Sequence, residues 1–181
     1  MSAVGQQVVV EPFNPQRHDR AAFSCGVESA DNFFKRTANK LASAGNIRLF
    51  VMTTLDGDVM GFYALNASAV DYTDLPPKYA RTRPGHGSIP VVYISMIAVD
   101  RNYAGQGRGG ELLADALRRV ALAAESVGIA LVVLDILDDG NPTLIDKRRT
   151  LYQSYGFLPM PTRPLRLFLP VAAIGGELVR S

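Results

Sequence analysis

A glycine-rich segment past the middle of the chain has the composition of a phosphate-binding turn. The apolar run Val91–Val99 precedes it, and Glu111–Val127, which has helix formers throughout and apolar residues at helical spacing, follows it. The first N–H groups of a helix have no backbone partner, the helix dipole adds roughly half a positive charge there, and glycines let the backbone approach a ligand closely. A strand, a glycine turn and a helix in this order predict an anion site at Tyr103-Ala104-Gly105-Gln106-Gly107-Arg108-Gly109-Gly110.

The residues of this turn leave more than one ligand open. A Walker A turn is excluded, because no lysine follows the glycines. Gly105-x-Gly107-x-x-Gly110 satisfies the dinucleotide-binding pattern, but it follows an antiparallel hairpin instead of opening the fold, and Asp135 lies somewhat far downstream to bind a ribose. A dinucleotide, another phosphate-bearing ligand and a purely structural turn remain as alternatives.

Side chains that could move a proton are scarce near this turn. The run Val91–Val99 holds no carboxylate and no histidine, and the two histidines, His18 and His86, are better explained as surface residues. Glu111 is best explained as a solvated first-turn residue that favours the helix dipole. No general base is therefore identified near the turn.

The elements around the turn predict an α/β chain with an α+β layout. Expected strands are Val8–Val10, Ile47–Thr54 and Val59–Val70, the last two joined by an Asp56-Gly57 hairpin. A further strand, Ile129–Leu134, is expected to pair in parallel with the run before the turn through a right-handed crossover. The other expectations are two helices within Asp19–Ser43 that meet at Ser24–Val27, an irregular loop over Asp71–Pro90, a helix over Thr143–Tyr155, a strand at Leu165–Leu169 and a short helix at Ala172–Arg180.

Length and composition favour one globular domain over residues 1–181. Hydrophobic residues make up 48% and charged residues 20% of the chain, and the net charge of +2 permits a local basic patch without indicating a nucleic-acid binder. The single cysteine, Cys25, excludes an internal disulfide. Because Met1–Gln7 lacks the features of a secretory signal, the expected compartment is the cytoplasm. No apolar run is long enough to predict a transmembrane helix.

Two motifs resemble those of the GNAT family of N-acetyltransferases. Val99–Gly109 resembles the acetyl-CoA motif Gln/Arg-x-x-Gly-x-Gly/Ala, with Gly107 and Gly109 at its small positions and Ala104 in place of Gln or Arg. Leu151–Phe157 resembles the signature Phe-Tyr-x-x-x-Gly-Phe and stands in the family's order. The resemblance covers roughly the whole chain. It implies the GNAT fold, which has a mixed central sheet with an antiparallel N-terminal half, a βαβ acetyl-CoA unit and helices on both faces.

The resemblance also implies roles for individual residues. Acetyl-CoA is the implied co-substrate, and no metal is implied. Tyr152 takes the position of the acid that reprotonates the CoA thiolate, and the alternative is a core tyrosine that packs its helix onto the sheet. Arg101 or Arg108 could supply the charge that Ala104 lacks. The positions implied to contact the cofactor are Ile97, Ala98, Val99, Ala104, Gly105, Gln106, Gly107, Arg108, Gly109, Gly110 and Asn141.

Further segments resemble GNAT toxins of toxin–antitoxin pairs. Phe23–Phe33 resembles their Phe-x-Cys-Gly-x-x-x-Leu-Asp-x-Phe segment, with Ala30 in place of Leu, and Gly61–Leu65 and Leu167–Pro170 resemble two of their strands. This resemblance implies acetylation of the α-amine of aminoacyl-tRNA, a small DNA-binding antitoxin and a homodimer, with Cys25 in a structural role. The basic residues Lys35, Arg36, Lys40, Arg48 and Lys147–Arg149 could form a collar for an acceptor stem or merely solvate helix faces.

The sequence thus predicts an acetyl-CoA-dependent N-acetyltransferase that acts on aminoacyl-tRNA as a translation-blocking toxin. Two alternatives remain open. One is an acetyltransferase for a small amine or a protein without a toxin role. The other is a non-catalytic module that binds acyl-CoA.

Overall fold

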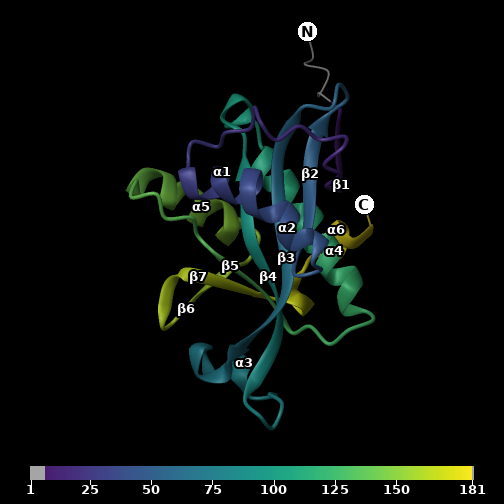
Figure 1. Ribbon diagram of the computed structural model, residues 1–181. Helices are drawn as coiled ribbons and strands as arrows, with labels where there is room; N and C mark the ends of the chain where they lie inside the picture. The colour runs from purple at the N-terminus through teal and green to yellow at the C-terminus, as the bar shows by residue number, and fades with distance from the viewer. Residues whose placement is uncertain (1–6, 181) are drawn as a thin grey trace. The chain divides into compact units, whose positions relative to one another are not determined.

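The computed structural model describes residues 7–180. Seven strands belong to one sheet in the order β1-β2-β3-β4-β5-β7-β6 (Figure 1). The strands are β1 (Val8–Pro12), β2 (Arg48–Thr54), β3 (Val59–Asp71), β4 (Ser88–Val99), β5 (Leu131–Asp135), β6 (Leu158–Met160) and β7 (Arg163–Pro170). The helices are α1 (Glu28–Asn32), α2 (Ala38–Ser43), α3 (Pro77–Ala80), α4 (Arg108–Ala124), α5 (Pro142–Ser154) and α6 (Gly176–Arg180).

The pairing of the strands confirms the predicted mixed sheet. β1, β2 and β3 pair antiparallel in chain order, whereas β4 and β5 pair in parallel. β7 pairs antiparallel with both β5 and β6. Gly57 has a φ of 91° in the β2–β3 turn, which explains why the Asp-Gly pair marks this hairpin. Strand β6 was not expected from the sequence, because only three residues form it and two of those are exposed.

The described chain divides into two compact units. The first unit comprises residues 7–65 and 96–115, and the second comprises residues 66–95 and 116–180. β3, β4 and α4 contribute residues to both units. The single domain over residues 1–181 stays a prediction, and its ends, residues 1–6 and 181, lie outside the described residues.

Aromatic rings form the core of the first unit. The ring of Phe34 stacks on that of Phe62 at 4.3 Å between centroids, and Phe23 meets Phe34 edge-on at 5.0 Å. All three side chains are at most 2% exposed. Phe34 lies in a π-helical segment, Phe33–Thr37, that joins α1 to α2, so these rings pack this helical segment against β3.

The prediction of a helix before Ser24 is wrong. Residues 19–27 contain no α-helix, and the helical segment begins at Glu28. The backbone of Ser24 and Cys25 instead hydrogen-bonds to the side chains of Asp100 and Asp31. These hydrogen bonds to side chains take the place of helical backbone hydrogen bonds, and the local periodicity of the sequence does not reveal them.

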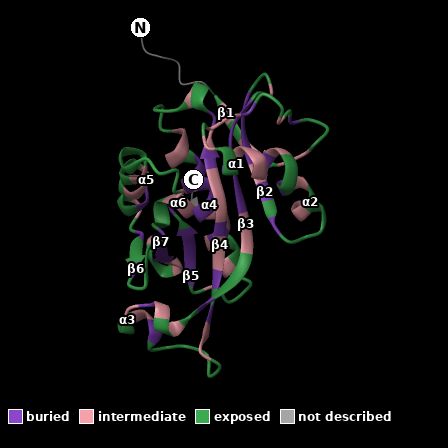
Figure 2. Cartoon of the chain, turned by 60° about the vertical axis from the view of Figure 1, so that its left-hand side comes forward, coloured by how far each residue is buried: buried purple, intermediate pink, exposed green. Residues whose placement is uncertain are grey.

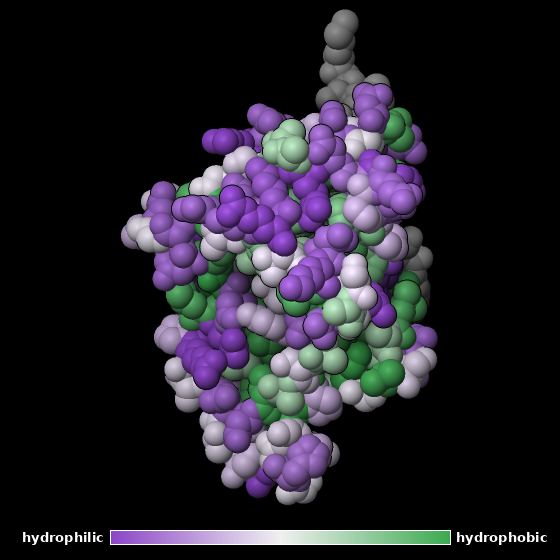
Figure 3. All heavy atoms as spheres, in the orientation of Figure 1, coloured by the Kyte–Doolittle hydropathy of each residue, from purple (hydrophilic) through white to green (hydrophobic). Residues whose placement is uncertain are grey.

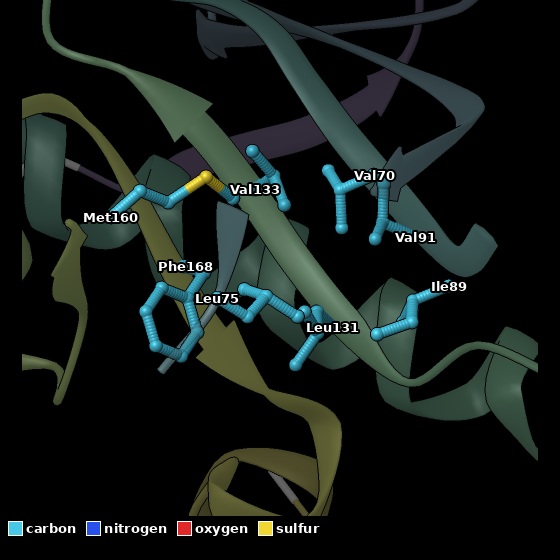
Figure 4. Close-up of a cluster of buried hydrophobic side chains, with 8 residues drawn as sticks. All are labelled: Val70, Leu75, Ile89, Val91, Leu131, Val133, Met160 and Phe168. Carbon is cyan, nitrogen blue, oxygen red and sulfur yellow. The ribbon is translucent and has the colours of Figure 1, made fainter. Parts of the chain in front are cut away.

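The second unit has a separate apolar core on β4, β5 and β7 (Figure 4). Its buried side chains are Val70, Leu75, Ile89, Val91, Leu131, Val133, Met160 and Phe168. In Figure 2 the strand β5 is mostly purple, because the alternation of exposed and buried residues is lost where a strand is covered on both faces.

The expected irregular loop over Asp71–Pro90 is also wrong. This segment contains a 3₁₀ turn at Tyr72–Asp74, the helix α3 and the first residues of β4. Leu75 and Ala80 within it are at most 6% exposed. Prolines indicated a loop, but packing against the sheet orders the segment.

Element boundaries elsewhere differ from expectation by a few residues. α4 begins three residues earlier than expected, at Arg108, and ends at Ala124, before Gly128. α5 and β7 confirm the expected helix and strand. Among residues 7–180, none of the helices combines the length and the apolar character that crossing a bilayer requires.

Candidate active site

The predicted anion-binding turn lies in the first unit between β4 and α4. β4 ends at Val99, a 3₁₀ turn spans Arg101–Tyr103, and α4 begins at Arg108. Gly105 and Gly107 have φ values of 74° and 78°, a conformation that side chains disfavour. Residues 104–107 are exposed, so the backbone at the start of α4 is accessible to a ligand. The predicted cofactor positions 97–99 and 104–110 thus lie at the end of a strand, in a turn and at the start of a helix, whereas Asn141 belongs to the second unit.

Asp100 fixes the beginning of the turn. Its Oδ1 accepts the N–H of Asn102 at 2.8 Å, and its Oδ2 accepts the N–H of Ser24 at 3.0 Å. The N–H of Arg101 in turn donates to the carbonyl of Ser24 at 2.9 Å. The side chain of Asp100 is 4% exposed, so these bonds satisfy a buried carboxylate.

A second carboxylate holds the segment that Asp100 contacts. Asp31 accepts the hydroxyl of Ser24 at 2.9 Å and the N–H of Cys25 at 2.8 Å. These hydrogen bonds lower the pKa of Asp31 despite the opposing effect of desolvation. Sequence reasoning missed both carboxylates as positioning residues. The available signals were an aspartate directly after a buried strand and the aspartate of the Phe-x-Cys-Gly segment.

The first turns of α4 pack closely on β3. A Cβ at Gly61 would lie 2.7 Å from Cδ1 of Leu112 and 2.9 Å from the carbonyl oxygen of Ala98. Further along both elements, the hydroxyl of Tyr63 donates to Oδ2 of Asp115 at 2.5 Å, and both side chains are buried. Gly61 thus permits a close approach, and the Tyr63–Asp115 bond fixes the helix that carries the anion-binding end.

One of the two arginines at the turn, Arg108, forms an ion pair within the protein. Nη1 of Arg108 lies 2.9 Å from Oε2 of Glu111, which makes Glu111 an ion-pair partner at the helix start. The Arg108 side chain is 11% exposed, and its Nε finds no hydrogen-bond partner within the described chain. Arg101 is exposed. The hypothesis that Arg101 or Arg108 supplies the charge that Ala104 lacks stays a prediction, because Nε of Arg108 is unpaired but buried.

Tyr152 lies in the second unit, on the last turn of α5. Its side chain is 5% exposed and meets the ring of Phe157 edge-on at 6.2 Å. Burial raises the pKa of Tyr152 to about 12, an effect that the charge of Arg148 partly offsets. No hydrogen bond joins its hydroxyl to another residue of the described chain. The hydroxyl is therefore protonated at neutral pH and retains its proton for donation.

Asn141 caps the helix that carries Tyr152. Its Oδ1 accepts the N–H groups of Thr143 and Leu144 at 3.1 and 3.4 Å. The preceding loop is held by Arg148, which donates to the carbonyl of Leu137 at 2.7 Å and pairs with Asp139 at 3.1 Å. The carbonyl end of Asn141 is thus used inside the protein, and only its amide N–H groups are left for the cofactor contact that was predicted.

The two histidines, which were weighed as proton-transfer residues from the sequence, already hydrogen-bond within the protein. Nε2 of the buried His18 lies 2.8 Å from Glu11, and its Nδ1 accepts the N–H of Asn14. His86 is exposed and its Nδ1 accepts the N–H of Ser88. Burial raises the pKa of Cys25 to about 11, so the thiol stays protonated, in agreement with a structural role.

A tryptophan in place of Gly107 tests the location of the anion site. The substitution places a side chain at a φ of 78°, which strains the backbone by about 1–2 kcal/mol, but its Cβ meets no heavy atom within 4 Å. The protein should fold, and the indole should occupy the space of the ligand's phosphates. We expect the affinity for acetyl-CoA, measured by calorimetry, to fall about tenfold or more.

Gly45→Trp provides the matched control for this measurement. Gly45 has the same φ of 78° and the same open space at its Cβ, but it lies between α2 and β2. Its variant should bind acetyl-CoA as the wild type does. Unchanged affinity in Gly107→Trp would show that the phosphates bind elsewhere.

The chain matches the family model described as "Acetyltransferase (GNAT) family" over residues 16–157. It is 55% identical over 167 residues to a protein of Sinorhizobium fredii named "Probable toxin TacT", with 92% of each chain covered. It is 36% identical over 151 residues to the "tRNA-acetylating toxin" of Mycobacterium tuberculosis, and the match covers 83% of this chain and 85% of the relative.

Solved structures resemble the fold over nearly the whole chain. A structure of AtaT complexed with acetyl-methionyl-tRNAfMet has a TM-score of 0.80 and 27% identity, and covers 97% of this chain and 100% of that chain. A mutant AtaT toxin bound to the C-terminus of the antitoxin AtaR and acetyl-CoA has a TM-score of 0.73 and 25% identity, with 93% and 96% covered. The matches confirm the GNAT fold predicted from the sequence. The chain belongs to the GNAT family of acetyltransferases.

Proposed function

We propose that this acetyltransferase transfers the acetyl group of acetyl-CoA to the α-amine of an aminoacyl-tRNA and thereby blocks translation. The observation that carries the proposal is an accessible glycine turn at the start of α4 in a chain that is 55% identical to a probable toxin. The tRNA-acetylating relative and the AtaT complex with acetyl-methionyl-tRNAfMet support this choice of acceptor.

The glycine turn would bind the cofactor through its backbone. The N–H groups at the start of α4 and the helix dipole favour the pyrophosphate of acetyl-CoA, and glycines at 105 and 107 keep side chains away from it. Ala104 contributes no side-chain donor, so the guanidinium of Arg108, at the start of α4, is the proposed source of added positive charge. Ile97–Val99 and the amide of Asn141 are the remaining proposed contacts.

Tyr152 would act as the general acid. The neutral amine attacks the acetyl carbonyl carbon and its nitrogen becomes positively charged. The carbon–sulfur bond then breaks, the leaving thiolate takes the proton of the Tyr152 hydroxyl, and the nitrogen of the new amide releases its excess proton to solvent. With a pKa of about 12, the tyrosine then recovers a proton from solvent. An α-amine is partly neutral near pH 8, so this scheme requires no strong base.

The compartment and the protein partners of the enzyme follow from the same proposal. A tRNA substrate places the reaction in the cytoplasm. The AtaT structure with the C-terminus of AtaR supports a small antitoxin as a partner, and the resemblance to the toxins supports a homodimer.

An acetylation assay with purified components tests the function. The chain is incubated with acetyl-CoA labelled in the acetyl group and with total aminoacyl-tRNA. Mild alkaline hydrolysis should then release labelled N-acetyl amino acids. Uncharged tRNA, small amines and short peptides serve as control acceptors. Label transfer only to amines or peptides would contradict the proposal, and absence of transfer to any acceptor would support a non-catalytic module.

A further inference from the structure

We propose that the connection between β3 and β4 carries a binding site for a nucleotide of single-stranded RNA, formed by Tyr72, Arg81 and Arg83. The inference rests on the proposed function, because aminoacyl-tRNA is the RNA that this enzyme would meet. The connection was expected to be an irregular loop and has no part in the site described above.

A depression of about 460 Å³ lies in this connection. Tyr72, Leu75, Pro77 and Ala80 contribute apolar surface to it, and Arg81 and Arg83 line it with two cations. An apolar floor beside guanidinium groups suits a nucleotide, which presents a flat base and a charged phosphate. In Figure 3, hydrophilic and apolar residues lie side by side in the region where Figure 1 places α3.

The depression is anchored to the sheet of its own unit. Leu75 and Ala80 are buried, and the ring of Tyr79 meets that of Phe168 edge-on at 5.1 Å. The hydroxyl of Thr162, in the β6–β7 turn, donates to Oδ1 of Asp74 at 3.1 Å. These contacts pre-form the site, so binding would cost little ordering of the chain.

Arg83 is held in a defined orientation although it is exposed. Its guanidinium carbon lies 3.9 Å from the centroid of the Tyr72 ring, and its Nη1 donates to the carbonyl of Ala80 at 3.2 Å. Gly87, at a φ of 80°, leaves room for the same ring, because a Cβ there would lie 3.2 Å from Cδ1 of Tyr72. A guanidinium stacked on an aromatic ring offers its other face to a base and its N–H groups to a phosphate.

The charge around the depression favours an anion. No acidic residue occurs between Leu75 and Val99, whereas Lys78, Arg81 and Arg83 are exposed there. The two nearest carboxylates are engaged: Asp74 accepts from Thr162, and Asp71 accepts the N–H and the hydroxyl of Thr73. The Arg83 guanidinium stacked on Tyr72 and the apolar floor favour RNA, whose bases can stack. An acidic peptide would use only the positive charge of the arginines.

Binding of fluorescein-labelled uncharged tRNA, followed by anisotropy over a series of salt concentrations, tests the proposal. Arg83→Gln should raise Kd at least about fivefold, as removal of one stacked base does, and should reduce the salt slope by about 0.7 for each phosphate that Arg83 neutralises. Arg83→Lys and Tyr72→Ala keep the charge but remove the stack, so each should also raise Kd. Arg17→Gln removes one exposed cation that pairs with Glu11 and is the matched control, with Kd expected within about twofold.

The outcomes separate this inference from the proposed function. If Arg83→Gln and Tyr72→Ala bind tRNA as the wild type does, or if Arg17→Gln weakens binding as much as Arg83→Gln, the site is wrong. If an acidic peptide binds the wild type at this depression and tRNA does not, the surface docks proteins and the proposal also fails. Binding requires no turnover, so failure of the wild type to acetylate aminoacyl-tRNA would overturn the function alone. Calorimetry with acetyl-CoA verifies that each variant is folded.

Discussion

Replacement of Tyr152 by phenylalanine is expected to lower kcat for acetyl transfer by about 10²–10⁴-fold, the usual contribution of a positioned general acid. The substitution removes only a hydroxyl that bonds to no residue of the described chain, so the ring packing against Phe157 should persist. The affinity for acetyl-CoA and the melting temperature should therefore change little. Steady-state kinetics, calorimetry and thermal unfolding measure the three quantities.

Tyr155→Phe is the matched control for this substitution. Tyr155 follows the last turn of the same helix and loses the same hydroxyl in the variant. Its kcat should stay within about threefold of the wild type, since it does not occupy the position of the acid. Equal losses in both variants, or a Tyr152→Phe variant that keeps more than about a tenth of kcat, would show that Tyr152 is only a packing residue.

The pKa of Tyr152 also shapes the pH dependence. Because burial raises this pKa to about 12, the acid stays protonated across the neutral and mildly alkaline range. For an α-amine acceptor, kcat/KM should rise from about pH 6 to pH 8 as the amine loses its proton, and should show no alkaline fall up to about pH 10. The folded state keeps the proton of Tyr152 up to a pKa of about 12, above the ordinary tyrosine value, so this group contributes a loss of stability as the pH rises from about 10 toward 12. Cys25 and Tyr93, whose pKa values burial also raises, contribute to the same alkaline loss.

Gly61→Ala is expected to disturb the packing between β3, β4 and α4. The added Cβ would overlap the buried Leu112 side chain at 2.7 Å and the Ala98 carbonyl at 2.9 Å. α4 and β4 must then move away from β3, at a cost of about 1–3 kcal/mol in the free energy of unfolding. Because the anion-binding end belongs to α4, the affinity for acetyl-CoA should fall as well.

The matched control is Gly128→Ala. No heavy atom lies within 4 Å of a Cβ at Gly128, so its stability and acetyl-CoA affinity should match those of the wild type. Thermal unfolding measures the stability of both variants, and calorimetry measures their affinity for acetyl-CoA. A Gly61→Ala protein with unchanged stability and affinity would mean that the α4–β3 contact does not position the site.

Local sequence signals identified the parts of the site that depend on backbone conformation. Gly105 and Gly107 occupy left-handed φ values, which favour glycine so strongly that the turn is visible in the sequence. The continuous apolar run before them predicted β4, because a strand covered on both faces loses the alternation of polar and apolar residues, and the helical spacing after them predicted α4. The position of Tyr152 came from a motif resemblance, and its chemical role remains a proposal.

Long-range contacts determined what the sequence did not reveal. Ser24 lies outside the helical segment because its N–H donates to the side chain of Asp100, 76 residues away. The N–H of Cys25 donates to the side chain of Asp31, six residues away, in place of a helical bond. The proline-rich segment is ordered because Leu75 within it packs against side chains of distant strands. The sequence by itself determined the glycine turn, the sheet's main strands and the family. Only the tertiary structure decided why Gly61 must be glycine and how Arg83 stacks on Tyr72, because both depend on atoms that meet across the folded chain.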